Sequence, residues 1–519
     1  MFYAIIGVIR GAMRVKFLSL IIIILLFMNV AIADEGLRTM FLNNKAVICG
    51  IIIRNFNAKD SNGNGIIDSN EESGNFINAI ERLDEIKELN INTLHLLPIT
   101  PVGKLKALGT AGSVYAMSDF DSINPQLVDK NSSLSSMEQA KLFVDECHKR
   151  GIKVVIDLPS CGAYDLFLSN PELFIKDKKQ LSIVPTDWTD VRLLNTGKDD
   201  SLNQDVLLAH KKFVDMVLEL GADGIRADVA TIKPYKFWEE LIEYTRRKNP
   251  EFLYLAEASD SWREPPSKYA VFTPYDKLLL AGFDGYYGSF FNLKDWKTAE
   301  PFMEHVKFNK KLLTSYPEDK SVILSFTTHD EVSPIVLHGE KFSVMIAWLE
   351  ATLPYNPYFI DGFQTGDDYL YPWANLRAKA TETDDDYYFV HRGKLDIFNF
   401  SRKPGGKNEF VKANFKEAFR FRTENSDLIS KGTFTPLKAD KEKVFAFSRS
   451  YQGETVIVIG NLDYKHPQKR VSVKVSGLKK KKEMQVVEGL TNHKTKNNRL
   501  ITDLEAGEIK VLRMNNFAL

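Results

Sequence analysis

The sequence Gly221-Ala-Asp-Gly-Ile-Arg-Ala-Asp228 sets the pattern that the rest of the chain follows. A run with helical periodicity, residues 205–220, stops at a glycine, and a short predicted strand, residues 222–228, comes after it. Arg226 and Asp228 are two residues apart, which places both side chains on one face of that strand. An arginine beside a carboxylate favours the ionised form that a nucleophilic aspartate requires. The alternative is a purely structural ion pair at a strand end.

The same alternation of strand and helix extends in both directions from this segment. Apolar runs of strand length predict buried strands at residues 45–53, 92–98, 152–157, 222–228, 252–257, 283–287, 321–326 and 357–360. Helical patterns between them predict helices at residues 75–89, 135–150, 205–220, 235–247, 298–314 and 341–353. This succession predicts an α/β fold with a closed (β/α)8 TIM barrel, in a catalytic domain of residues 34–430. Residues 158–200 have little periodicity and predict a short insertion after the third strand.

The last part of the chain has a different pattern. After a predicted helix at 415–429, residues 431–519 contain short strand-like runs separated by turns, at 444–449, 455–461, 471–475, 484–487 and 507–512. Short strands at regular spacing without helical periodicity are typical of a β-sandwich. The sequence therefore predicts a C-terminal all-β domain.

The first 33 residues predict a secretory signal. Arg10, Arg14 and Lys16 precede an apolar run at 17–30, and Ala31-Ile-Ala33 supplies a small-x-small cleavage site. We expect cleavage after Ala33 and a secreted or periplasmic protein with no membrane association after cleavage. An uncleaved membrane anchor is the alternative, although the apolar run is short for a membrane span.

Composition restricts the classes of partner. The chain has 519 residues, 44% hydrophobic and 26% charged, and its formal net charge is zero, which indicates a globular protein rather than a disordered one. Zero net charge does not favour nucleic acid as a partner and points to a neutral substrate. The three cysteines, Cys49, Cys147 and Cys161, give neither a disulfide framework nor metal-thiolate spacing. The oligomeric state cannot be read from the sequence.

An oxygen-rich loop follows the first predicted strand. Oxygen-bearing side chains stand at loop positions 1, 3, 5, 9 and 12, with a glycine at position 6 and an apolar residue at position 8. In the template for a calcium loop, the residue at position 7 binds through its backbone carbonyl. These residues are Asp60, Asn62, Asn64, Ile66, Asp68 and Glu71. Hard cations require several oxygens from one tight turn, so we expect structural Ca²⁺ here, with Mg²⁺ the second possibility. An ordinary Asn/Gly-rich turn is the alternative.

Polar residues gather at the ends of the predicted strands. They are Asp157, Asp228, Glu257, His329 and Asp330. In a (β/α)8 barrel, the carboxyl ends of the strands carry the catalytic groups. Several carboxylates facing one site cannot all be ionised cheaply, so the pKa of at least one should be raised. A raised acid beside an ionised nucleophile is the arrangement that cleaves glycosidic bonds.

These motifs together resemble the α-amylase family of glycoside hydrolases along nearly all of the mature chain. The family's strand-4 motif resembles Gly224-Ile-Arg-Ala-Asp228, its strand-5 glutamate resembles Glu257, and its strand-7 pair resembles His329-Asp330. The strand-2 loop resembles that of the family at Tyr115 and Asp119, and the strand-8 pattern at Pro354, Pro357 and Gly362. The loop at Asp60 is similar to the cation loop of the oligo-1,6-glucosidase-like members.

The resemblance implies roles for these residues. Asp228 would be the nucleophile, Glu257 the general acid and then base, and Asp330 the third catalytic carboxylate. His329, Arg226, Tyr115 and Asp119 would bind substrate or support the catalytic groups, with Tyr115 stacking on the sugar. Retention of anomeric configuration would place the Asp228 and Glu257 carboxyl groups about 5–5.5 Å apart.

The chain departs from the family pattern after the third strand. The motif that starts at Asp157 normally ends in an asparagine–histidine pair, whereas this chain has Cys161 and Gly162. In the family, the histidine contacts the bound sugar and the asparagine is a ligand of a second calcium. We therefore expect no cation at that second position and an altered activity or sugar preference.

The resemblance implies a retaining α-glycoside hydrolase acting on α-1,4- or α-1,6-linked glucans or maltooligosaccharides, so that the partner is an oligo- or polysaccharide. Two alternatives stay open. One is a transglycosylase on the same substrates, and the other is a catalytically impaired member that binds glucan or a protein. Linkage and chain-length preference cannot be read from the sequence.

Overall fold

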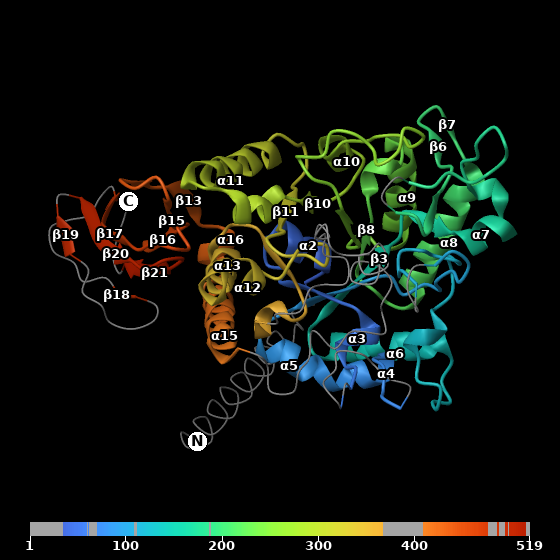
Figure 1. Cartoon of the computed structure of the whole chain (residues 1–519), viewed down its shortest axis with the longest axis horizontal. Helices are drawn as coiled ribbons and strands as arrows, with labels where there is room; N and C mark the ends of the chain where they lie inside the picture. The colour runs from blue at the N-terminus through green and yellow to red at the C-terminus, as the bar shows by residue number, and fades with distance from the viewer. Residues whose placement is uncertain are drawn as a thin grey trace, which may run out of the picture.

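A closed barrel of parallel strands forms the main domain (Figure 1). The structure, a computed structural model, describes residues 35–59, 61, 70–107, 112–185, 188–366, 408–475, 485–486, 494–496 and 498–514. In order around the barrel, the strands are β1 (Ile48–Ile51), β12 (Asn356–Ile360), β11 (Ser321–Leu324), β10 (Gly285–Tyr287), β9 (Leu253–Ala256), β8 (Gly224–Ala227), β3 (Lys153–Leu158) and β2 (Thr93–Leu96). This confirms the predicted (β/α)8 barrel. Every residue of these strands is buried, which explains their continuous apolar character.

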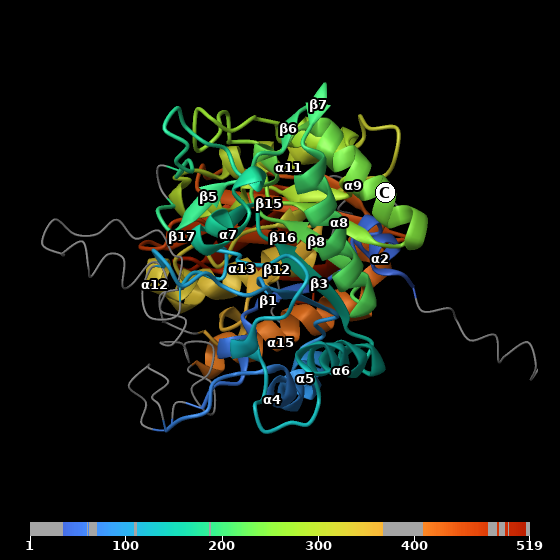
Figure 2. The same cartoon turned by 90° about the vertical axis from the view of Figure 1, so that its right-hand side faces the viewer.

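Helices lie on the outer side of the barrel (Figure 2). The helices are α2 (Leu37–Leu42), α3 (Ile53–Phe56), α4 (Phe76–Ala79), α5 (Leu83–Glu88), α6 (Ser136–Lys149), α8 (Gln204–Glu219), α9 (Tyr235–Lys248), α10 (Tyr275–Leu280), α11 (Ala299–Leu313), α12 (Pro334–His338), α13 (Glu340–Thr352), α15 (Glu409–Glu424) and α16 (Ser426–Ser430). The predicted single helix at 415–429 is wrong in its bounds. The Asn408 side chain accepts the Val411 N–H and starts α15 earlier, and the chain breaks between α15 and α16 at Asn425.

The register of the strands brings the motif residues together. Strands β3 and β8 pair with Asp157 opposite Arg226, and β8 and β9 pair with Ala227 opposite Ala256. A Cβ atom at Gly224 would lie 2.8 Å from both Cβ and O of Leu253, so the close approach of β8 to β9 requires glycine there. The residues directly after β8 and β9 therefore meet at one edge of the barrel.

The predicted insertion after β3 is a small subdomain at the far end of the molecule from the C-terminal domain (Figure 1). It contains β4 (Cys161–Ala163), α7 (Tyr164–Ser169), β5 (Val191–Leu193) and the hairpin of β6 (Gly197–Lys198) and β7 (Ser201–Leu202). Strands β4 and β5 are antiparallel, and their apolar side chains share a cluster with Val229 and Ile232, which follow β8. The insertion is thus packed directly against the segment that carries Asp228.

Two antiparallel sheets form the C-terminal domain. One has the order β13 (Thr433–Pro436), β15 (Val444–Tyr451), β16 (Glu454–Asn461), β21 (Ile509–Met514) and β18 (Gln485–Val486). The other has the order β14 (Lys438–Ala439), β17 (Gln468–Lys474), β20 (Arg499–Leu504) and β19 (Lys494–Lys496). The predicted β-sandwich is confirmed, although β13, β14, β19 and β20 were not predicted.

The first sheet is buried on both faces because it also covers the barrel domain. Ala446 and Ile457 belong to the apolar core between the two sheets, whereas Phe445 and Val456 belong to the core of the barrel domain. The ring of Phe445 packs edge-on against Phe302 of α11, with ring centroids 5.2 Å apart. The two domains consequently share a packed interface.

Some predictions concern residues beyond those that the structure describes. The signal sequence, residues 1–33, lies outside them. In the described part of the chain, no helix is long and apolar enough to cross a membrane. Cys49, Cys147 and Cys161 are buried free thiols.

Candidate active site

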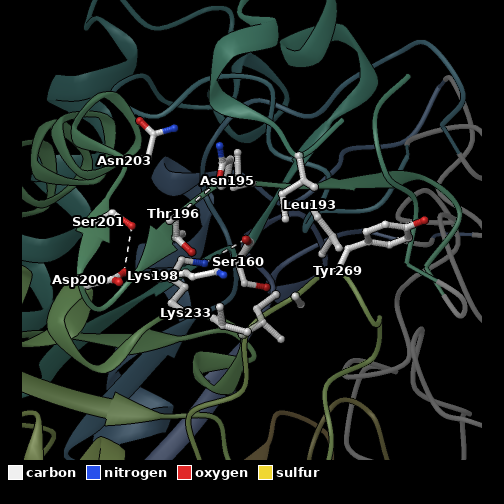
Figure 3. A pocket seen from close by; sticks show the side chains of 16 residues that line it. Ser160, Leu193, Asn195, Thr196, Lys198, Asp200, Ser201, Asn203, Lys233 and Tyr269 are labelled. Carbon is white, nitrogen blue, oxygen red and sulfur yellow. Dashed lines mark hydrogen bonds between the residues drawn. The ribbon is translucent and has the colours of Figure 1, made fainter. Parts of the chain in front are cut away.

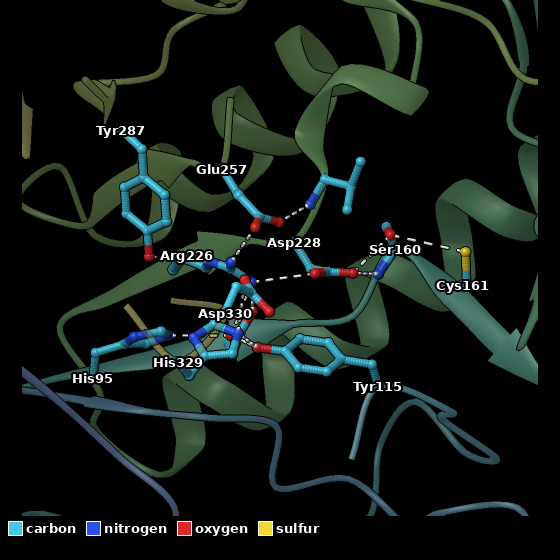
Figure 4. A network of polar contacts seen from close by, with 12 residues as sticks. His95, Tyr115, Ser160, Cys161, Arg226, Asp228, Glu257, Tyr287, His329 and Asp330 are labelled. Carbon is cyan, nitrogen blue, oxygen red and sulfur yellow. Dashed lines mark hydrogen bonds and ion pairs between the residues drawn. The ribbon is translucent and has the colours of Figure 1, made fainter. Parts of the chain in front are cut away.

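The predicted catalytic carboxyl groups come together at the carboxyl ends of the barrel strands (Figure 4). Asp228 follows β8 directly, Glu257 follows β9, and Asp330 lies in the loop after β11. Asp157 belongs to β3 itself. This is the edge of the barrel where strand ends converge, and the side chains of all these residues approach one arginine.

Arg226 is the centre of the site and is almost completely buried. Its Nη1 lies 2.9 Å from Asp157 Oδ1 and 3.2 Å from Asp228 Oδ1, and its Nη2 lies 2.9 Å from Glu257 Oε1. The predicted Arg226–Asp228 contact exists, but the same guanidinium also serves two other carboxyl groups. One buried cation cannot balance three carboxylates that are buried or largely buried, so the site favours a proton on one of the carboxyl groups.

Glu257 is a carboxyl group whose surroundings favour the protonated form. Burial raises the pKa of Glu257 well above its ordinary value; Arg226 opposes this shift, and the neighbouring Asp228 and Asp330 increase it. The backbone N–H of Val229 donates to Glu257 Oε2 at 2.6 Å. A glutamate with a raised pKa beside an ion-paired aspartate can act as a general acid.

Val229 adopts an unusual backbone conformation directly after Asp228. Its φ of 34° and ψ of 54° are left-handed, which is rare for a β-branched residue and costs roughly 1–3 kcal/mol. This conformation turns the Val229 N–H toward Glu257. The backbone strain therefore lies where the nucleophile and acid candidates are connected.

Asp330 is the most exposed of the three predicted catalytic carboxyl groups. Desolvation raises its pKa, which Arg226 opposes and the nearby Asp228, Glu331 and Asp157 increase. Its side chain is 49% exposed, compared with 11% for Glu257, so solvent screens the shift at Asp330 more strongly. We therefore assign the main proton-holding role to Glu257.

Asp157 is contacted by Arg226, His95 and Tyr115. Burial alone would raise its pKa, but Arg226 and His95 outweigh burial and leave the pKa below its ordinary value. The Tyr115 hydroxyl donates to Asp157 Oδ2 at 2.9 Å, and His329 Nε2 lies 2.8 Å from that hydroxyl. The rings of Tyr115 and His329 lie nearly parallel, with centroids 5.7 Å apart. The predicted residues Tyr115 and His329 thus join the catalytic group.

Asp119 does not join this network in the described part of the chain. Its carboxylate accepts hydrogen bonds from the Ser122 hydroxyl and the Asp121 N–H. These contacts stabilise its own loop, so a substrate-binding role for Asp119 stays a prediction.

The predicted cation loop lies almost entirely outside the described residues. This applies to Asp60, Asn62, Asn64, Ile66 and Asp68, whereas Glu71 is described. Glu71 Oε1 accepts hydrogen bonds from the backbone N–H and the hydroxyl of Ser61, at 2.7 Å and 2.6 Å. Binding of Ca²⁺ or Mg²⁺ at this loop stays a prediction.

The residues at the second cation position do not fit a hard cation. Burial raises the pKa of the Cys161 thiol to about 12, so it stays protonated. The Lys233 ammonium group donates to the Ser160 carbonyl at 2.9 Å, and burial lowers its pKa only to about 8. The ammonium group repels a divalent cation, and a protonated thiol is a poor ligand for a hard cation, which prefers oxygen. A Cβ atom at Gly162 would lie 2.7 Å from Cζ of Phe174, so that ring fills the space beside Gly162.

Several residues of the site were not identified from the sequence. His95 Nε2 lies 3.2 Å from Asp157 Oδ2, and the Tyr287 hydroxyl accepts a hydrogen bond from Arg226 Nε at 3.3 Å. Ser160 donates to Asp228 Oδ2 from its hydroxyl at 2.7 Å and from its backbone N–H at 3.0 Å. His95 could have been found from its position in a predicted strand, but nothing in the sequence marks Ser160 or Val229.

The enzyme class that fits this fold, with carboxyl groups gathered at its strand ends, is that of the glycoside hydrolases. The chain is 22% identical over 497 residues to Alpha-amylase 3 of Dictyoglomus thermophilum, covering 87% of this chain and 91% of that protein. It is 22% identical over 436 residues to an alpha-1,4-glucan:maltose-1-phosphate maltosyltransferase of Bifidobacterium animalis, covering 78% of this chain but only 54% of that protein. Together with the structural match below, these matches show that the chain is similar to α-amylases and related glucan-acting enzymes along most of its length.

A solved α-amylase structure from Lactobacillus plantarum has the same fold. It aligns with a TM-score of 0.68 at 20% sequence identity and covers 91% of this chain and 99% of that chain. No protein-family model matches the chain.

Proposed function

We propose that this chain is a retaining α-glycoside hydrolase acting on α-1,4- or α-1,6-linked glucans or maltooligosaccharides. The observation that supports this most directly is the arrangement around Arg226. One guanidinium contacts both Asp228 and Glu257, and burial raises the pKa of Glu257 well above its ordinary value. The site thus combines a carboxylate nucleophile with a protonated acid.

In the first step, an Asp228 oxygen attacks the anomeric carbon of the sugar. The glycosidic bond breaks as Glu257 gives its proton to the departing oxygen, and a covalent glycosyl ester of Asp228 forms. Once Glu257 has lost its proton, the nearby Arg226 Nη2 and the Val229 N–H stabilise the new negative charge.

In the second step, Glu257 takes a proton from a water molecule. The oxygen of that water bonds to the anomeric carbon, and the electron pair of the ester bond returns to Asp228. Two displacements on one carbon retain the anomeric configuration. The nearly half-exposed Asp330, with Tyr115 and His329, stands where sugar hydroxyl groups can be bound.

Transglycosylation is the second candidate. A sugar hydroxyl that replaces water in the second step gives transfer, and one relative of this chain is named a maltosyltransferase. An impaired binding protein is less consistent with the site, because all three predicted catalytic carboxyl groups and Arg226 are present.

The test is release of reducing sugar from maltooligosaccharides, starch and pullulan by the mature chain, with Asp228→Asn as control. Chromatography of the products separates hydrolysis from transfer, since transfer gives products longer than the substrate. Equal release by the wild type and Asp228→Asn would contradict the enzymatic function.

Two further parts of this proposal concern export and calcium. The signal at residues 1–33 supports secretion or export to the periplasm, and fractionation with sequencing of the mature N-terminus tests it. The spacing from Asp60 to Glu71 supports a structural Ca²⁺, and calorimetric titration of wild type against Asp60→Ala tests that site.

A further inference from the structure

We infer that Ser160 is a positioning residue for the nucleophile, and that it promotes breakdown of the glycosyl ester more than its formation. The inference rests on the proposed function. It gives a role to the segment after β3, where Cys161 and Gly162 stand in place of the asparagine–histidine pair of the α-amylase family pattern.

Ser160 holds one oxygen of Asp228, while Arg226 holds the other. The Ser160 hydroxyl and backbone N–H both donate to Oδ2, at 2.7 Å and 3.0 Å, and Arg226 Nη1 lies 3.2 Å from Oδ1 (Figure 4). A hydroxyl has one proton, and the charged oxygen at 2.7 Å is a nearer acceptor than Cys161 Sγ at 3.9 Å. The proton of the hydroxyl is therefore directed to Asp228.

Lys233 fixes the peptide that carries these donors. Lys233 is 1% exposed, and its ammonium group donates to the Ser160 carbonyl at 2.9 Å. Ser160 and Lys233 both line a pocket of about 540 Å³ between the insertion and the loop after β9 (Figure 3). Hydrogen bonds thus run from the Lys233 ammonium group to Ser160 and from Ser160 to Asp228. Through them, a protein cation supports the contact between the insertion and the nucleophile.

The charge on Asp228 decides which step this contact favours. Asp228 is a full carboxylate before attack and after release, but an uncharged ester in the intermediate. Hydrogen bonds to a carboxylate are roughly twice as strong as those to a neutral oxygen. Ser160 therefore stabilises the free carboxylate relative to the ester, whichever oxygen carries the sugar, and it stabilises the charge that returns to Asp228 during the second step.

Ser160→Ala removes the hydroxyl and keeps the N–H. With α-maltosyl fluoride, whose good leaving group makes the first step fast, we expect kcat to fall on the order of 10-fold to 100-fold. We expect KM to fall with kcat, so that kcat/KM changes by only a few fold, and the maltosyl ester of Asp228 should accumulate in mass spectra of the quenched enzyme.

Ser160→Thr keeps the hydroxyl and should restore turnover to within a few fold of wild type. Ser321→Ala is the matched control. Ser321 is a fully buried serine that donates to Asn44 Oδ1 at 2.6 Å, but it stands at the amino end of β11. This control should leave kcat and KM unchanged.

The outcomes separate the two proposals. A wild type that does not turn over the fluoride contradicts the proposed function and with it this inference. A wild type that does, together with a Ser160→Ala variant that keeps kcat or loses kcat/KM by the same factor as kcat, overturns only the role of Ser160.

Discussion

The segments after β8 and β3 meet at Asp228, yet they contribute different chemistry. After β8 and β9, the charged groups are held by ion pairs to the buried Arg226. After β3, the groups are neutral: a serine that donates to Asp228, a buried thiol, and Gly162 packed against Phe174.

The carboxyl groups take part in the proposed reaction itself, whereas the neutral groups after β3 hold the barrel and the insertion together. The proposed two-step mechanism requires one ionised and one protonated carboxyl group, and the chain has Asp228 and Glu257 at these places. A connection between the barrel and the insertion can be made in several ways. Here, apolar packing and the hydrogen bond from the Lys233 ammonium group to the Ser160 carbonyl supply it.

The largest expected effect comes from Asp228→Asn, which removes the nucleophile but keeps the shape. We expect kcat to fall at least on the order of 10⁴-fold, because loss of a nucleophile prevents formation of the covalent intermediate. Steady-state kinetics on maltotriose measures it. The variant should unfold at a temperature similar to that of the wild type. If its activity fell only slightly, Asp228 would not be the nucleophile.

The second effect concerns Arg226→Met, which removes the cation and leaves its carboxyl partners buried. We expect a loss of about 3–5 kcal/mol in the free energy of unfolding at pH 7, measured by denaturant titration. The loss should be smaller at pH 5, where protonation relieves repulsion among these groups.

Arg246→Met is the matched control for this variant. Arg246 pairs with Asp284 at 2.6 Å, on the loop before β10 and away from the catalytic groups. It should lose stability and keep its kcat. An Arg226→Met variant that behaved like this control would contradict the central place of Arg226.

Many of the charged groups around Arg226 could be predicted from the sequence, whereas most contacts of the neutral groups after β3 could not. Buried parallel strands give continuous apolar runs, and polar residues directly after them must lie at one edge of the barrel, so Asp228 and Glu257 were accessible. The pairing of Asp157 with Arg226 depends on the register of β3 against β8, which single-sequence patterns do not contain.

The contacts of Ser160 and Val229 were hidden for a different reason. The Ser160 hydroxyl reaches Asp228 across 68 positions of sequence through the packing of the insertion. The left-handed backbone of Val229 contradicts the preference of a β-branched residue and is imposed by its surroundings. Local patterns cannot predict a conformation that tertiary structure enforces.

The third effect is the pH dependence of catalysis. The acid must be protonated in the first step, and the pKa of Glu257 is raised well above its ordinary value. As pH rises through this raised pKa, Glu257 loses its proton, and kcat/KM should fall about tenfold per pH unit. The fall should begin well above the ordinary range of glutamate, and it should be absent in Glu257→Gln assayed with α-maltosyl fluoride, which needs no acid. A decline centred on the ordinary range would contradict the buried state of Glu257.

The smallest expected effect comes from Gly162→His, which restores the family residue on the neutral side. A Cβ atom there meets Phe174 at 2.7 Å and Leu166 at 3.1 Å, so the side chain must displace the ring. We expect a loss of about 1–3 kcal/mol in the free energy of unfolding, and no gain in activity on maltotriose. Phe174→Ala makes room for the imidazole. In the double variant, the loss in the free energy of unfolding should therefore be smaller than the sum of the losses of the two single variants. A stable, more active Gly162→His variant would mean that the end of β3 still has the family's sugar-binding geometry and that Phe174 does not exclude it.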